Sequence, residues 1–163
     1  MNDSPKIYLS EYAQKKYGVS GSIDFKTWVN YCGVLLVISG ADGELAEEEL
    51  NWLIKEQTSY GATEEIIQAI QSFDWKAANL EELLATLMYE FSINARRTLL
   101  YQAITMSRAD GVYHKEEKKA IWNSAKMLGV EPSVVSTLES LVEMEETVNK
   151  LRYSVLETIA HEA

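Results

Sequence analysis

The sequence predicts an all-α fold, a helical bundle made of two tandem four-helix repeats with pseudo-twofold symmetry. The chain has 163 residues but only 2 Pro and 8 Gly, which leaves little room for long irregular segments. No stretch alternates polar and apolar residues with a period of two, so we expect no sheet. The stretch Ser39–Glu49 recurs as Ser107–Glu117 at an offset of 68 residues, and apolar positions around it recur at the same offset. Two copies of one helical unit would explain this repetition.

Length and charge limit the organisation of the chain and its partners. A chain of 163 residues can bury one substantial core, so we expect a single domain over residues 1–163. Its 25 acidic and 15 basic side chains give a net charge of −10. Nucleic acid is not expected as a partner, because neutralising phosphates needs clustered Lys and Arg. An acidic protein favours cations or basic protein surfaces instead.

The sequence indicates a cytoplasmic protein. The N-terminus shows no charged region followed by an apolar segment, so we expect no signal peptide. The apolar run Gly33–Ile38 is much shorter than the ~20 residues of a membrane span. Cys32 is the only cysteine and cannot form an intrachain disulfide, so we expect a buried thiol in a reducing compartment.

The first predicted element is an N-terminal helix over residues 4–17. Ser4 would cap it, Pro5 would occupy its first position, and Gly18 would end it in the left-handed conformation. Repeat one then covers about residues 24–91, and repeat two covers about residues 92–160.

Each repeat is expected to contain four helices in the same order. The first helix is apolar on most sides (Trp28–Ile38 and Leu99–Met106), which predicts a central position. Gly61 and Gly129 should end the second helices as left-handed caps. In repeat one, the second helix should cover residues 46–59, the third should start at Thr63, and the fourth should cover 80–91. In repeat two, the second helix should cover 114–128, the third should start at Pro132, and the fourth should cover 148–159.

Each acidic turn has a complete structural interpretation. Asp42 and Asp110 can accept hydrogen bonds from the backbone N–H groups that follow, and the glycine after each can adopt a positive φ. Glu49 and Glu117 fall three residues after the expected N-caps, at the capping-box position. The N-cap residues, however, are Ala and His rather than Ser or Thr, so half of each box is missing although both carboxylates are kept. This mismatch favours a second role for the carboxylates.

The second role that we consider is the binding of a divalent cation. Asp42, Glu49, Asp110 and Glu117 would converge if the two repeats pack around their turns, and carboxylate oxygens suit Ca²⁺, Mg²⁺ or Mn²⁺. Neither turn is an EF-hand, because a 12-residue loop begun at either aspartate ends on an apolar residue where the bidentate glutamate is needed. His114 could bring in Zn²⁺, but a lone histidine beside the turn is expected to be a solvated surface residue.

Nothing in the sequence indicates an enzyme. There is no Gly-rich phosphate loop, nucleophile elbow or His-Glu-x-x-His helix. Most aromatic residues follow helical spacing and are expected in the core. Trp75, which follows Asp74 in a loop, is expected to be exposed and to contact a partner.

The repeated Ala-Asp-Gly motif, with Glu seven residues after Asp and a long helix before each copy, resembles the TerB-like tellurite-resistance family over about residues 22–160. The resemblance implies an all-α bundle with internal pseudo-twofold symmetry and a role in resistance to tellurite and other stresses. It also implies metal binding by the acidic residues that match the motif. Related domains occur fused to DnaJ-type co-chaperone modules and beside membrane partners. The second turn is less acidic than the first, so two equal sites are not expected.

The leading hypothesis is a non-enzymatic, cytoplasmic stress-response module that binds a divalent cation (Ca²⁺, Mg²⁺, Mn²⁺ or Zn²⁺) at its paired acidic turns. It would also dock onto other proteins, including membrane-associated ones. The alternative is a protein-interaction scaffold whose acidic turns are purely structural. Homo-oligomerisation would be indicated by an exposed apolar strip on the last helix, Val148–Ile159.

Overall fold

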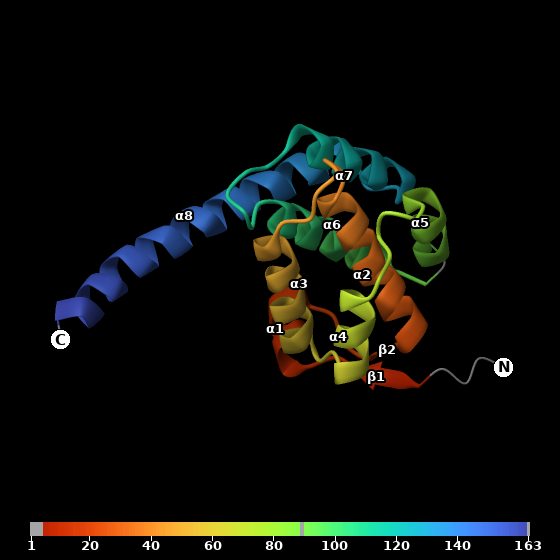
Figure 1. The fold of residues 1–163 in the computed structure, drawn as a ribbon, viewed down its shortest axis with the longest axis horizontal. Coiled ribbons are helices and arrows are strands. Elements are labelled where there is room, and N and C mark those ends of the chain that lie inside the picture. The colour runs from red at the N-terminus through yellow and green to blue at the C-terminus, as the bar shows by residue number, and fades with distance from the viewer. Residues whose placement is uncertain (1–4, 89, 163) are drawn as a thin grey trace.

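The protein is an all-α bundle with a small two-stranded sheet near its N-terminus (Figure 1). The computed structural model describes residues 5–88 and 90–162, with side chains up to residue 157. Within these ranges no helix has the length and apolar character needed to span a membrane. The elements are β1 (Lys6–Tyr8), α1 (Glu11–Tyr17), β2 (Ser22–Asp24), α2 (Phe25–Ser39), α3 (Glu47–Tyr60), α4 (Glu64–Gln71), α5 (Leu80–Met88), α6 (Ile93–Ser107), α7 (Lys115–Met127) and α8 (Pro132–Glu162).

Helix α2 is the centre of the bundle. It packs against α3, α4, α5, α6 and α7, and side chains on nearly all its sides are buried, including Trp28, Leu35 and Ile38. Helix α6 is the second central helix and packs against α2, α3, α7 and α8. A helix that is apolar on most sides needs neighbours on most sides. The central position predicted for both helices is confirmed, as is the burial of Cys32.

Several helix ends follow the capping signals in the sequence. The Thr63 and Asn79 side chains accept hydrogen bonds from backbone N–H groups three residues later, at the starts of α4 and α5. Pro132 occupies the first position of α8, as predicted. Gly61 and Gly129 adopt φ values of 114° and 70° after α3 and α7, so the predicted left-handed caps are confirmed.

The N-terminal segment differs from the prediction. The expectation of no sheet is wrong, because β1 pairs with β2 in an antiparallel arrangement. Each strand has only three residues, which is too short to show the alternation that reveals a half-buried strand. The helix predicted over 4–17 begins only at Glu11 with Ser10 as its N-cap, and Ser4 lies outside the described residues.

The second repeat also differs from the prediction, because it does not end in two separate helices. Residues 72–79 separate α4 from α5, whereas the equivalent part of repeat two lies inside the continuous helix α8. No Gly or Pro interrupts residues 133–162, so little in the sequence ends the helix that starts at Pro132. Helix α8 therefore extends well beyond the bundle (Figure 1).

The connection between α4 and α5 places two aromatic rings against glycines of the α2 segment. A Cβ atom at Gly33 would lie 2.5 Å from Phe73 Cζ, and one at Gly40 would lie 2.3 Å from Trp75 Cζ3. Only a residue without a side chain allows rings to approach the helix this closely. Trp75 therefore packs on α2 and is half-buried, so the expectation that it would be exposed is wrong.

We expect Gly33→Ala to lower the free energy of unfolding by about 1–3 kcal/mol, because the added methyl group overlaps the Phe73 ring. The higher helix propensity of alanine would by itself raise the free energy of unfolding by about 1 kcal/mol. Chemical denaturation of Gly33→Ala, Phe73→Ala and the double variant measures the coupling. Gly33→Ala should destabilise the Phe73→Ala variant much less than it destabilises the wild type. An equal loss of stability in both proteins would contradict this explanation.

Candidate metal centre

The two acidic turns fold locally as the sequence predicts. Asp42 Oδ1 accepts a hydrogen bond from the N–H two residues later at 3.2 Å, and Asp110 Oδ1 does the same at 3.0 Å. Gly43 and Gly111 adopt φ values of 97° and 89°, a region that residues with a side chain rarely enter. Each aspartate thus uses one oxygen to hold its own turn and keeps its Oδ2 for contacts outside that turn.

His114 connects the two turns. Its Nε2 lies 3.6 Å from Asp42 Oδ2, in the first turn, and 3.5 Å from Asp110 Oδ2, in the second. The three side chains are only 18–37% exposed. His114 thus keeps part of its surface in solvent, as expected, but lies between the two aspartates instead of pointing freely into water. His114 lies at the N-cap of α7, and the packing of α7 against α2 brings its ring to the first turn.

Glu49 and Glu117 form a buried pair beside this histidine. Their residues are 2% and 0% exposed. One oxygen of each accepts a hydrogen bond from the backbone N–H of its N-cap, Ala46 at 2.9 Å and His114 at 3.1 Å. This is the carboxylate half of a capping box, and neither N-cap side chain supplies the other half. The second oxygen of each carboxylate is buried, and among the described residues no backbone N–H bonds to it; the neighbours of the Glu117 carboxylate are the Glu49 carboxyl group and the Ser107 hydroxyl.

The two glutamates resist ionisation. The pKa of Glu49 is raised to about 8. Burial is the main cause, and the hydrogen bond with Glu117 and the nearby charges of Glu117 and Asp110 contribute to the same rise. Burial also raises the pKa of Glu117, and the charge of Asp42 adds to this effect. The negative charge of the aspartate in the opposite turn therefore acts on each glutamate, and the four carboxylates form one electrostatic cluster.

A metal ion could bind where these side chains meet. Ligand atoms of Asp42, His114 and Glu117 lie within 4.8 Å of one another. A small adjustment would bring all three within the about 2.0–2.2 Å that Zn²⁺ requires from nitrogen and oxygen ligands. Asp110 contacts the same histidine, and Glu49 faces Glu117.

The structure therefore brings all four acidic residues predicted from the sequence into one region. His114 joins them; the sequence raised it as a possible zinc ligand but favoured a solvated surface residue, because its only signal was its position four residues after Asp110. Its approach to Asp42 depends on the packing of the two repeats, which the spacing of residues does not show.

The raised pKa of Glu49 predicts that the metal-free protein loses stability as the pH rises from 4.5 to about 8. The folded state keeps a proton on Glu49 in this range, whereas the unfolded chain releases it, so each rise in pH favours unfolding. Even one pKa unit of this shift corresponds to about 1.4 kcal/mol, and 1 kcal/mol changes the melting temperature of a protein of this size by about 2–4 °C. We therefore expect the melting temperature to fall by about 3 °C or more. Calorimetric melting across this pH range in the presence of a chelator measures the effect.

Glu49→Gln is the matched test of this prediction. Glutamine keeps an oxygen that can accept the Ala46 N–H bond but cannot ionise. The variant should lose less stability across the same pH range, whereas Glu48→Gln, on the exposed neighbouring residue, should behave like the wild type. Identical pH dependence in all three proteins would show that Glu49 is not the group responsible.

Comparison with known proteins agrees with this fold. The family model described as tellurite resistance protein TerB matches residues 33–139. The structure is similar to that of a tellurite resistance protein from Nostoc punctiforme, with 26% sequence identity, a TM-score of 0.73 and 88% of each chain covered. A search of curated proteins gave no match. Since the family model covers more than half of the chain and includes both acidic turns, this protein belongs to the TerB family.

Proposed function

We propose that this protein is a non-enzymatic tellurite-resistance module that binds one divalent cation between its two acidic turns. The observation that carries the proposal is the meeting of Asp42, His114 and Glu117, which come from two turns far apart in the sequence. Membership of the TerB family and the similarity to a tellurite resistance protein support the cellular role.

The buried carboxylate oxygens favour a cation over a purely structural role. Local hydrogen bonds use only one oxygen of Asp42, Glu49, Asp110 and Glu117. A buried carboxylate oxygen whose hydrogen bonding is incomplete costs roughly 1–3 kcal/mol, and such an atom often marks an ion-binding position. A cation would satisfy these oxygens and offset the burial that raises the pKa of the two glutamates, together with the smaller effect of the neighbouring negative charges.

The side chains present also indicate which ion would bind. Asp42 and Glu117 would supply oxygen ligands and His114 its Nε2, with Asp110 either orienting the histidine or completing the ligand set. Mixed imidazole and carboxylate donors suit Zn²⁺ or Mn²⁺ better than Ca²⁺ or Mg²⁺, which prefer oxygen ligands alone. We therefore expect Zn²⁺ and Mn²⁺ to bind most tightly of the four ions.

The alternative function is a protein-interaction scaffold with structural turns. The two turn bonds and the two capping bonds favour it, because each acidic residue already has a local role without any ion. The cytoplasmic location and docking onto other proteins, including membrane-associated ones, stay predictions from the sequence.

Titration calorimetry with Zn²⁺, Mn²⁺, Ca²⁺ and Mg²⁺ tests cation binding. We expect one ion per chain, and a rise in stability of about 2.7 kcal/mol at an ion concentration one hundred times the dissociation constant. Glu117→Gln should weaken binding at least about tenfold, because a charged ligand becomes a neutral amide. Glu116→Gln, an exposed neighbour with the same change of charge, is the control.

If no ion releases or absorbs heat and none raises the melting temperature, the metal-binding proposal fails and the scaffold becomes the better explanation. Equal weakening by Glu116→Gln and Glu117→Gln would show non-specific attraction to an acidic surface and would also contradict a defined site.

A growth assay on tellurite tests the cellular role. A strain lacking its own copy should regain tellurite resistance with the wild-type protein and should lose it with Asp42→Asn/Asp110→Asn. Asparagine can keep both turn hydrogen bonds, so the folded structure should survive while two charges are removed. Glu44→Gln/Glu116→Gln, on exposed residues, provides the matched control. Resistance that is unaffected by the Asp variants would separate the cellular role from the acidic cluster.

A further inference from the structure

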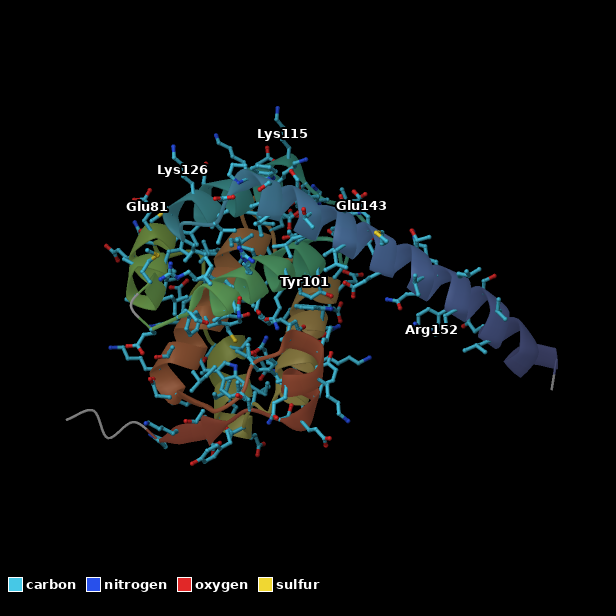
Figure 2. All side chains as sticks on the ribbon, turned by 180° about the vertical axis from the view of Figure 1, so that it is seen from behind. Glu81, Tyr101, Lys115, Lys126, Glu143 and Arg152 are labelled. Carbon is cyan, nitrogen blue, oxygen red and sulfur yellow. The ribbon has the colours of Figure 1, made fainter. Side chains whose placement is uncertain are left out.

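The C-terminal half of α8 projects from the bundle (Figure 1). The first half packs against α6 and α7, with Val135 and Val142 buried. From residue 147 to residue 157 every residue is exposed. Figure 2 shows this arrangement, with Glu143 near the place where α8 leaves the bundle and Arg152 on the projecting half.

An apolar stripe runs along α8 from the end of its packed half into its projecting half. Its members are spaced alternately three and four residues apart, which places them on one side of the helix as the a and d positions of a coiled coil. Their exposed fractions range from 42% to 66%, which is unusual for side chains of this kind. The α8 stripe consists of Leu141, Met144, Val148, Leu151 and Val155.

The residues beside the α8 stripe are compatible with packing against the same helix of a second copy. One edge carries the small hydroxyl residues Ser140, Thr147 and Ser154, and the other carries Glu145 and Arg152. The acidic residues at 143, 146 and 157 point away from the stripe by the same helical geometry. A chain with a net charge of −10 thus keeps like charges off this one face.

We propose that the α8 stripe binds the α8 stripe of a second copy, with the two helices antiparallel. In this arrangement Val148 faces Leu151 of the other copy, and Met144 faces Val155. Glu145, whose carboxylate accepts the Tyr101 hydroxyl within its own chain, then lies beside Arg152 of the other copy, and twofold symmetry gives two such charge pairs. A parallel arrangement would place Arg152 beside Thr147 and would create no such pair.

A groove at the base of the stripe adds to this interface. Leu141 begins the stripe and also lines a groove of about 340 Å³ with Leu138, Tyr101 and Arg97. In an antiparallel pair the C-terminal end of the other helix reaches this groove. The stripe alone covers about two heptads, fewer than the three or four heptads that sustain a stable coiled coil. We therefore expect a reversible dimer whose population depends on concentration.

Sedimentation velocity of the full chain over a range of concentrations tests the dimer. The wild type should shift from monomer to dimer as concentration rises, and Leu151→Asp, in the middle of the stripe, should remain monomeric. Tyr153→Asp, an equally exposed change on the opposite side of α8, should behave like the wild type. Circular dichroism of each variant confirms that the helices are intact. A wild type that stays monomeric, or equal effects of the two substitutions, would overturn the proposal.

Charge reversal tests the antiparallel direction. Arg152→Glu should raise the dimer dissociation constant roughly tenfold, because two attractive contacts become repulsive. Lys150→Glu has the same effect on net charge but lies away from the stripe, so it should change the constant much less. Equal effects of the two variants would contradict the proposed pairing of Glu145 with Arg152.

Disulfide trapping gives a second measure of direction, and the buried native Cys32 should not interfere. Under mild oxidation, a mixture of Met144→Cys and Val155→Cys chains should give the mixed dimer, because these positions face each other in the antiparallel pair. Met144→Cys alone should give little dimer. Efficient self-linking of Met144→Cys would indicate parallel helices and would overturn the antiparallel arrangement.

Discussion

The contact between Glu49 and Glu117 is the constraint on which the site depends. Each carboxylate holds the start of a helix through one oxygen, α3 in one case and α7 in the other, and buries its second oxygen near the other carboxylate. Two carboxylates buried side by side cannot both be ionised unless something compensates their charge. A shared proton or a bound cation are the two means of compensation, so the state of this pair is sensitive to both pH and metal.

The contact between the two turns also explains why α2 pairs with α6 and why the capping boxes are incomplete. Helices α2 and α6 are apolar on most sides and pack against each other, so the turns that follow them are brought together. A serine at the N-cap of α7 would complete the box but could not reach Asp42. His114 leaves the box incomplete and instead places its Nε2 between the aspartates of both turns. The missing half of the box is thus explained by a contact between the repeats.

The sequence revealed the features that depend on neighbouring residues and missed those that depend on packing between distant segments. The Asp42 turn, the Thr63 cap and the Gly61 cap each need only a few adjacent residues, and all three are present. The approach of His114 to Asp42 and the packing of Trp75 over Gly40 each depend on how distant helices meet. The strands escaped detection because three residues are too few to show a period, and the unbroken α8 because repeat one suggested a break there.

The acidic cluster and the projecting helix are physically connected through Arg108. This residue lies two positions before Asp110, and its guanidinium bonds Glu146 through two nitrogens at 2.7 and 3.0 Å. Glu146 is the last half-buried residue before α8 leaves the bundle. Paired hydrogen bonds of this kind fix direction as well as distance, so they hold α8 to the segment that leads into the second turn, in addition to its packing on α6 and α7.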